Sequence, residues 1–181
     1  MAQVLMPLAV GFEEIEAITI TDILRRAGVE VVMAGLDREH VCGAHGISVK
    51  ADALLDEVEL STFDMIVLPG GLPGAEHLAK SEKVQQVLQY FDRDNKRIGA
   101  ICAAPWALAT AGVLKDKYTC YPSFEERIGK SGYVKDIDVV HDHNIITSRG
   151  PSTAMEFALA IVKELCGEET YTTLRAGLLL S

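Results

Sequence analysis

Short apolar runs alternate with longer amphipathic stretches along this chain. Most of the runs are bounded by charged or glycine-containing positions, which is typical of buried parallel strands. Strands are therefore expected at residues 3–8, 29–34, 64–68, 98–101, 118–121, 138–141 and 144–148, with a hairpin arm at 47–51.

The amphipathic stretches carry the marks of helices. In residues 13–28 the apolar positions follow the i, i+3, i+4, i+7 spacing of one helix face, with acids in the first turn and arginines in the last. Further helices are expected at 81–95, 105–111, 152–166 and 168–180, with a brief helical piece at 54–58 and a loop with one helical turn at 122–136. This alternation predicts an α/β fold, an open and mostly parallel sheet with helices on both faces.

Composition limits the class of protein without revealing its chemistry. The 181 residues are 49% hydrophobic and 24% charged, which suits a single domain over 1–181 with a substantial core. The net charge of −9 argues against nucleic acid and anionic membranes as partners. The sequence shows no signal peptide and no apolar run as long as a membrane span, so a cytoplasmic protein is expected.

The cysteines and histidines do not form a metal motif. The four cysteines lie far apart with no CxxC pair, so neither a zinc-type spacing nor a disulfide framework is expected. His141 and His143 form an HxH pair, but Asp142 and Asn144 around them indicate a turn between two strands. We therefore expect free thiols and no metal site.

Cys102 stands between a predicted strand and a predicted helix. Pro105 suits the first turn of that helix, and the small residues Ala103 and Ala104 allow a sharp turn before it. The partial positive charge and free N–H groups of a helix N-terminus stabilise a thiolate, so a thiol pKa below about 8.5 is expected. The alternative is a buried structural cysteine that packs as a small hydrophobe.

Glu16 lies four residues before Ile20 and so in line with the apolar face of helix 13–28. A buried carboxylate needs a partner, and burial raises its pKa, which suits a group that shuttles protons. The alternative is that the apolar face frays at the start of the helix, so that Glu16 reaches water.

Two consecutive glycines, Gly70 and Gly71, follow the strand at 64–68. Glycine tolerates positive φ and close backbone approach, and free N–H groups in such a turn bind an oxyanion. A tight connection between strand and helix explains the pair equally well. Because the carboxyl ends of parallel strands share one edge of the sheet, Glu16, the glycine pair and Cys102 are expected to meet there. That meeting favours a reactive Cys102.

Six segments together form a pattern shared with a known superfamily. They are Glu13-Glu14-Ile15-Glu16, Arg25-Arg26-Ala27-Gly28, Leu68-Pro69-Gly70-Gly71, Ala100-Ile101-Cys102-Ala103-Ala104-Pro105, Thr147-Ser148-Arg149-Gly150-Pro151 and Glu156-Phe157-Ala158-Leu159-Ala160. With them the chain resembles, nearly from end to end, the ThiJ/PfpI superfamily in its DJ-one (Parkinson-associated) branch. The resemblance implies a flavodoxin-like three-layer sandwich, a homodimer and a nucleophile-elbow cysteine.

The resemblance also implies roles for individual residues. In the family the cysteine is hydrogen-bonded to a protonated glutamate, and Cys102 and Glu16 match that pair. The family's oxyanion pocket is formed by the glycine pair and by the amide after the cysteine, which here are Gly70, Gly71 and Ala103.

Two further implications concern the facing subunit and the departures from the family pattern. Arg149 and Pro151 match an arginine and a proline that border the facing subunit's site, and Arg26 is expected near the dimer contact. Ala103 replaces the histidine of protease-like members, so a peptidase would lack its general base. Tyr121 replaces a histidine that the branch often has before a proline, and a phenol is a poor base at neutral pH.

The resemblance implies an enzyme that acts on small reactive carbonyls such as methylglyoxal, or on their early adducts, without a cofactor. This is a glutathione-independent glyoxalase or protein deglycase with Cys102 as nucleophile and Glu16 as proton shuttle. The alternative is an oxidative-stress sensor or redox-regulated chaperone without turnover, in which Cys102 oxidises to a sulfinate. Tyr121 favours the sensor hypothesis, because a phenol in place of the histidine weakens the acid–base catalysis that an enzyme would need. A sugar- or nucleotide-binding domain is a third hypothesis, and no motif supports it.

Overall fold

The computed structural model describes residues 1–180. Its strands are β1 Gln3–Leu8, β2 Glu30–Gly35, β3 His40–Cys42, β4 Ser48–Lys50, β5 Ala53–Leu54, β6 Met65–Leu68, β7 Arg97–Ile101, β8 Val139–Asp142 and β9 Ile145–Ser148. Its helices are α1 Glu14–Arg26, α2 Gly74–Lys80, α3 Glu82–Arg93, α4 Pro105–Thr110, α5 Phe124–Ile128 and α6 Ala154–Gly177, with 3-10 turns at Leu60–Thr62 and Pro151–Thr153.

Seven of the strands form one sheet, in the order β5-β2-β1-β6-β7-β9-β8. Every neighbouring pair in it is parallel except β8 with β9, which are antiparallel. The two remaining strands, β3 and β4, pair with each other as a separate hairpin. The open, mostly parallel sheet that the alternation of elements predicts is therefore confirmed.

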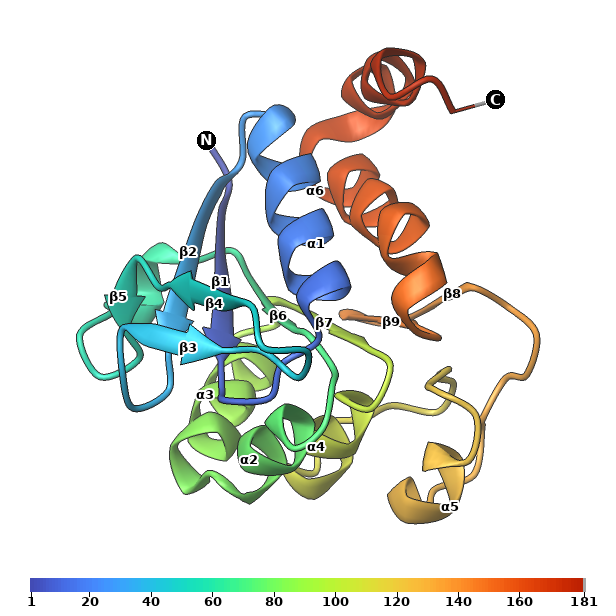
Figure 1. Cartoon of the computed structure of the whole chain (residues 1–181). Helices are drawn as coiled ribbons and strands as arrows, with labels where there is room; N and C mark the ends of the chain where they lie inside the picture. Colours follow the sequence, from blue (N-terminus) through green and yellow to red (C-terminus); the bar gives the residue numbers. More distant parts are fainter. Residues whose placement is uncertain (181) are drawn as a thin grey trace.

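Helices cover both faces of the sheet, giving three layers (Figure 1). Helices α1 and α6 pack together on one face, and α2, α3 and α4 lie on the other. Two clusters of buried apolar side chains result, one including Met6, Ile20 and Phe157 and the other including Leu5 and Phe91. Adjacent β1 residues enter opposite clusters because successive strand side chains point to opposite faces.

Most predicted elements are confirmed, with ends that differ by a few residues. The apolar face of α1 is buried, since Ile20, Ile23 and Leu24 are each at most 2% exposed. The side chain of Ser81 caps α3 by accepting a hydrogen bond from the N–H of Val84 at 3.3 Å. The predicted hairpin arm at 47–51 corresponds to β4.

Three local predictions are wrong or incomplete. Residues 118–121 form no strand, because Tyr118 makes only an isolated bridge to Tyr133 and the N–H of Thr119 donates to the side chain of Thr147 in β9 instead of to a backbone carbonyl. The helical piece predicted at 54–58 is a short strand followed by a turn. Helix α2 was not expected, since its seven residues begin with glycine and have no side-chain cap.

Helix α6 contains both helices that were predicted at the C-terminal end. It bends at Gly167, whose φ of 86° and ψ of 175° lie outside the helical region, between the predicted helices at 152–166 and 168–180. Pro151 begins a 3-10 turn before α6 rather than the α-helix itself. Neither α6 nor any other helix within residues 1–180 combines the length and the apolar content needed to cross a membrane.

Candidate active site

The carboxyl ends of three neighbouring strands bring the main predicted residues together. Glu16 lies in the first turn of α1, just after β1, and the glycine pair follows β6. Cys102 directly follows β7. Strands β1, β6 and β7 are adjacent in the sheet, so one edge presents all three groups, as the sequence predicts.

Cys102 occupies a strained turn between β7 and α4. Its φ is 64°, in the left-handed region that non-glycine residues avoid. Its N–H donates to the carbonyl of Ser148 at 3.0 Å, and its own carbonyl accepts from the N–H of Tyr121 at 2.9 Å. These bonds hold the turn, and the side chain is left 8% exposed beside the glycine pair. Strained conformations of this kind cluster at active sites and cost about 1–3 kcal/mol each.

Glu16 is completely buried, so the alternative in which it reaches water is wrong. Its Oε2 accepts a hydrogen bond from the N–H of Gly70 at 2.7 Å. Its Oε1 is buried and has no hydrogen-bond partner among residues 1–180. The carboxyl also lies close enough to Cys102 for each group to affect the protonation of the other.

Burial raises the pKa of Glu16 to about 7. The hydrogen bond from Gly70 and the contact with Cys102 lower the pKa, and the negative charge of Glu13 raises it further. The expectation of a raised pKa is therefore confirmed. A carboxyl with a pKa near 7 both accepts and returns a proton at neutral pH, which is the requirement for a general acid–base.

The prediction of a lowered pKa for the Cys102 thiol is wrong. Burial raises the pKa of this thiol, and the negative charge of an ionised Glu16 raises it further. The N–H groups of Gly71 and Ala103 act in the opposite direction and do not outweigh burial. Helix α4 has only six residues and begins at Pro105, three positions beyond the thiol, so its dipole contributes little.

The protonation states of Cys102 and Glu16 are coupled. When Glu16 is protonated, the charge that opposes ionisation of Cys102 disappears, and the carboxyl becomes a hydrogen-bond donor. When Glu16 is ionised, its carboxylate can instead accept the proton that leaves the thiol, so the two groups titrate as a pair.

The three predicted oxyanion residues divide into two roles. The N–H groups of Gly71 and Ala103 interact with the Cys102 sulfur, and their role in binding an oxyanion stays a prediction. The N–H of Gly70 is engaged by Glu16 instead. Gly70 also allows close packing, since a Cβ there would lie 2.6 Å from the Cβ of Cys102.

Tyr121, Arg149 and Pro151 lie together in a separate hollow of about 310 Å³, which Cys102 does not line. The N–H of Tyr121 donates to the carbonyl of Cys102, which joins this hollow to the cysteine turn. The Tyr121 side chain is 47% exposed. The guanidinium of Arg149 lies 3.7 Å from Asp136, while its Nε is buried without a partner among residues 1–180. The role of these residues in binding substrate stays a prediction.

Arg26 lies away from the site of its own chain. It is in the last turn of α1, ten positions after Glu16, or about 15 Å along the helix at 1.5 Å per residue. Its Nε lies 2.7 Å from Asp22.

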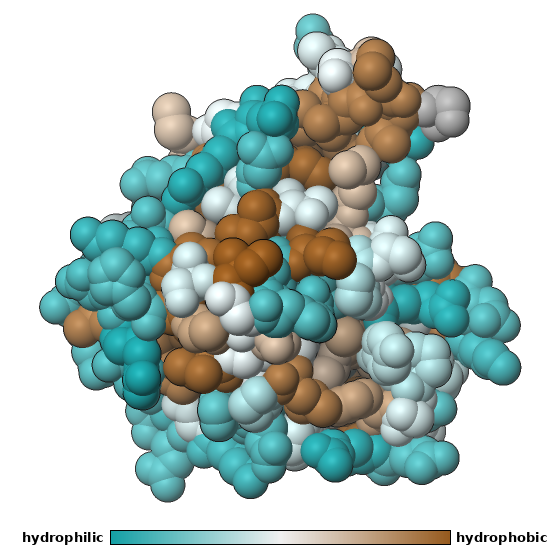
Figure 2. Space-filling view, in the orientation of Figure 1, coloured by the Kyte–Doolittle hydropathy of each residue, from teal (hydrophilic) through white to brown (hydrophobic). Residues whose placement is uncertain are grey.

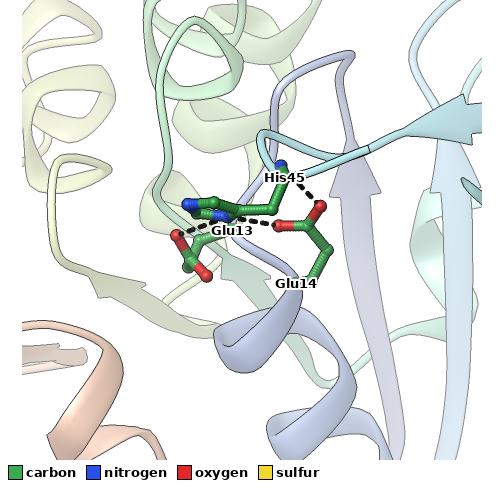
Figure 3. Close-up of side chains that lie close together, drawn as sticks. All are labelled: Glu13, Glu14 and His45. Carbon is green, nitrogen blue, oxygen red and sulfur yellow. Dashed lines mark hydrogen bonds and ion pairs between the residues drawn. The ribbon is translucent and has the colours of Figure 1, made fainter. Parts of the chain in front are cut away.

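Sequence reasoning missed a cluster of Glu13, Glu14 and His45 (Figure 3). Nδ1 of His45 lies 3.0 Å from Oε2 of Glu14 and 3.7 Å from Oε2 of Glu13. The contact with Glu14 raises the pKa of the His45 imidazole. His45 is in the turn between β3 and β4, 31 residues from Glu14, so no sequence spacing joins them.

Comparisons with known proteins agree with this architecture. Residues 2–164 match the model of the DJ-1/PfpI family. The chain is 43% identical over 180 residues to dj-1beta of Drosophila melanogaster, covering 98% of this chain and 96% of that protein. It is 39% identical over 170 residues to a Caenorhabditis elegans protein named glutathione-independent glyoxalase DJR-1.2, covering 93% and 91%.

The structural likeness is equally extensive. The crystal structure of Drosophila DJ-1beta superposes with a TM-score of 0.96 at 43% identity, covering 99% of this chain and 98% of that one. DJ-1 homolog B of Arabidopsis thaliana is 41% identical over 170 residues, covering 92% of this chain, which spans only 39% of that longer protein.

Proposed function

This chain belongs to the DJ-1/PfpI family, and from that premise we propose that it is a cysteine-dependent enzyme converting small reactive carbonyls. Methylglyoxal is the model substrate and lactate the product, as in a glutathione-independent glyoxalase. Early adducts of such aldehydes with thiols or amines are substrates of the same chemical class. The relative that carries the glyoxalase name supports this choice of reaction.

The observation that carries the proposal is the pairing of Cys102 with Glu16. A strained turn holds the sulfur at the edge of the sheet, beside a fully buried carboxyl with a pKa of about 7. Because a nucleophile with a positioned base is the common arrangement for covalent catalysis, this pair supplies what addition to an aldehyde requires.

The first step is addition of the sulfur to the aldehyde carbon. As the C–S bond forms, the thiol proton passes to the Glu16 carboxylate, and the electron pair of the C=O bond moves to oxygen. The N–H groups of Gly71 and Ala103 stabilise that oxyanion, and Glu16 returns its proton to give a hemithioacetal.

The second step is an internal redox rearrangement. Glu16 removes the proton from the former aldehyde carbon and delivers one to the adjacent carbonyl carbon, while the hydroxyl proton of the hemithioacetal moves to the former ketone oxygen, so the first carbon is oxidised and the second reduced. The product is a lactoyl thioester of Cys102. Water then hydrolyses this thioester, releasing lactate and restoring the thiol, and no external oxidant, metal or organic cofactor is consumed.

The residues around the pair support a small substrate and disfavour a peptidase. Ala103 stands where a peptidase would need a base next to its cysteine. The hollow formed by Tyr121, Arg149 and Pro151 offers a phenol and a guanidinium for the polar end of a substrate. We propose that it binds substrate, in this subunit or from the facing subunit of a homodimer.

A lactate assay with methylglyoxal tests the proposal. Cys102→Ser is expected to abolish turnover, and Glu16→Gln to reduce kcat by about 10²–10⁴-fold, the usual contribution of a general acid–base. Cys42→Ser is the matched control, because that half-buried cysteine lies outside the pair, and it should leave the rate unchanged. Turnover that survives in Cys102→Ser would end the claim.

A peroxide sensor is the second candidate, and the same N–H groups favour it. A sulfinate on Cys102 forms when the thiol consumes two molecules of hydrogen peroxide and releases two of water, and its oxygens would accept hydrogen bonds from Gly71 and Ala103. Mass spectrometry after mild peroxide treatment tests it. Cys102 should gain two oxygen atoms before Cys42, Cys120 or Cys166, and any other order contradicts a sensor role.

A further inference from the structure

We propose that Glu13, Glu14 and His45 form a binding site for one divalent cation of the zinc type. The three side chains converge from the start of α1 and from the β3–β4 turn (Figure 3). One ligand atom from each lies within 4.8 Å of the other two. A neutral imidazole and two carboxylates are ligands that Zn²⁺ accepts, and catalytic zinc sites commonly use three protein ligands.

The separations between the three side chains suit a tetrahedral ion. Metal–ligand bonds of about 2.0–2.2 Å place neighbouring ligand atoms of a tetrahedral site about 3.4 Å apart. Nδ1 of His45 lies 3.0 Å from Oε2 of Glu14 and 3.7 Å from Oε2 of Glu13. These values lie on either side of the ideal, so small side-chain rotations are enough to admit the ion.

The cluster contains a carboxylate oxygen, Oε2 of Glu13, that faces His45 and stays available to a cation. Glu13 is 8% exposed, and its Oε1 accepts from the N–H of Ile15 at 3.4 Å. Its Oε2 accepts no hydrogen bond from any residue in the range 1–180 and faces Nδ1 of His45, beyond hydrogen-bond distance. A carboxylate oxygen that no hydrogen bond occupies can bind a cation without first losing a protein donor.

Charge also favours a divalent ion over a proton. The side chains of Glu13 and Glu14 are 11% and 6% exposed, so both carboxylates are mostly buried. A proton on His45 leaves one net negative charge among the three groups, whereas a divalent cation with a neutral His45 leaves none. When the buried negative charge is fully compensated, the desolvation penalty of the two carboxylates falls.

The backbone holds the ligands in place before any ion binds. Oε1 of Glu14 accepts from the N–H groups of His45 at 2.7 Å and Ile47 at 3.3 Å, which leaves Oε2 to face the cation position. The N–H of Ala44 donates to the carbonyl of Phe12 at 2.8 Å, which fastens the β3–β4 turn to the start of α1. Such supporting hydrogen bonds orient metal ligands and reduce the reorganisation that binding requires.

The proposed cation site is open to solvent on the His45 side, and it lies beside the candidate active site. The His45 side chain is 69% exposed, so a water molecule can complete the coordination. The N–H of Glu13 donates to the carbonyl of Gly70 at 2.9 Å, which links the cluster to the turn that packs against Cys102. A cation here therefore stabilises the turn without being part of the carbonyl chemistry.

Calorimetric titration with Zn²⁺ tests the proposal on the whole chain. The titration uses Cys102→Ser protein, so that the thiol beside Glu16 cannot bind the metal. One ion per chain is expected, and His45→Ala and Glu13→Gln should each weaken binding at least about tenfold, the lower end of the loss seen for outer-shell partners. Binding that is absent, or that both variants leave unchanged, overturns the proposal.

The chain offers a matched control in His143→Ala. His143 is similarly exposed, at 65%, and its Nδ1 lies 2.9 Å from a single carboxylate, that of Asp142. Because a single His–carboxylate pair lacks the third ligand, this variant should bind Zn²⁺ as tightly as its parent. Equal losses in His143→Ala and His45→Ala would show nonspecific surface binding and contradict the site.

Nuclear magnetic resonance of the imidazole nitrogens provides a test that needs no variant at the site. Zn²⁺ should shift Nδ1 of His45 in the Cys102→Ser chain and leave His143 unchanged. A shift confined to other histidines refutes the site even if His45→Ala fails to fold. Since Cys102→Ser protein has no turnover under the proposed function, this result and the lactate assay succeed or fail independently.

Discussion

At the scale of single residues, Glu16 shows how a functional group opposes stability. Its Oε2 has the N–H of Gly70, but its Oε1 has no hydrogen-bond partner among the described residues. An ionised carboxylate is therefore poorly solvated there, and the protein holds the protonated form more tightly than water does. The environment that would suit Glu16 to the proposed proton transfer makes the folded chain less stable when Glu16 ionises.

Glu16→Gln should stabilise the protein at high pH. The pKa is 4.5 in the ordinary carboxyl and about 7 in the folded protein, so the native state binds more protons than the unfolded state between these values. The contribution of Glu16 to stability therefore falls as pH rises from 4.5 to about 7. Urea denaturation should show a gain of up to roughly 3 kcal/mol for Glu16→Gln near pH 8, and little gain near pH 4.

The control for this prediction is Glu126→Gln, at an exposed glutamate in α5. It should change the unfolding free energy little at either pH. A Glu16→Gln variant that is less stable than wild type at high pH would contradict the assigned burial cost.

Gly70 is the second residue whose environment leads to a specific expectation. A Cβ at this position would lie 2.6 Å from the Cβ of Cys102 and 2.9 Å from Oε2 of Glu16. Gly70→Ala should destabilise the fold by about 1–3 kcal/mol through overpacking and slow alkylation of Cys102 by iodoacetamide. Gly177→Ala is the control, because nothing lies within 4 Å of a Cβ there. Unchanged stability in Gly70→Ala would show that the backbone of the turn shifts to accommodate the methyl group without a measurable cost, which would contradict the prediction.

At the scale of elements, the turn from β7 into α4 is the most constrained connection of the site. Cys102 has φ 64° because its N–H is bonded to Ser148 and its carbonyl to Tyr121. Strand β9 and the loop at Tyr121 thus impose the conformation, and the residue's own preference does not. A left-handed conformation costs roughly 1–2 kcal/mol for a residue with a Cβ and much less for glycine.

Comparing two variants at this one position measures the strain. Cys102→Gly should be more stable than Cys102→Ala by about 1 kcal/mol, although glycine ordinarily destabilises a folded chain relative to alanine. Thermal denaturation under identical conditions is the measurement. Alanine equal to or better than glycine would mean that the turn relaxes once the thiol is gone.

At the scale of the whole molecule, one layer presents apolar side chains to solvent. Ile15 and Ile18 on α1 are 57% and 44% exposed, and Met155 on α6 is 37% exposed. Figure 2 shows hydrophobic surface over α1 and at the C-terminal end of α6. Together with the family resemblance, this surface supports the proposal that two copies of the chain associate through the α1 and α6 layer.

Sedimentation equilibrium tests the homodimer. Wild-type protein should sediment at twice the chain mass of 19.6 kDa, and Ile18→Lys should shift it toward the monomer because a charge then faces the apolar partner surface. Lys83→Ala, on the opposite helical layer, should leave the mass unchanged. A wild-type protein that sediments as a monomer at all concentrations contradicts the proposal.

The elements followed from local patterns wherever one physical cause prevailed. The buried face of α1, the start of α3 after Ser81 and the interruption at Gly167 between the predicted helices 152–166 and 168–180 depend on neighbours within a turn or two of helix, so the local sequence is enough to predict them. Residues 118–121 and α2 were mispredicted because their backbone partners are distant in sequence or their capping groups are absent.

The candidate site divides in the same way. The order of strands and helices was enough to bring Glu16, Gly70 and Cys102 to one edge, since parallel topology aligns the ends of neighbouring strands. The direction of the Cys102 pKa, the engagement of the Gly70 N–H by Glu16 and the meeting of His45 with Glu14 emerged only from the folded chain. Desolvation and hydrogen bonding depend on every atom packed around a group, and those atoms come from segments that a local pattern cannot connect.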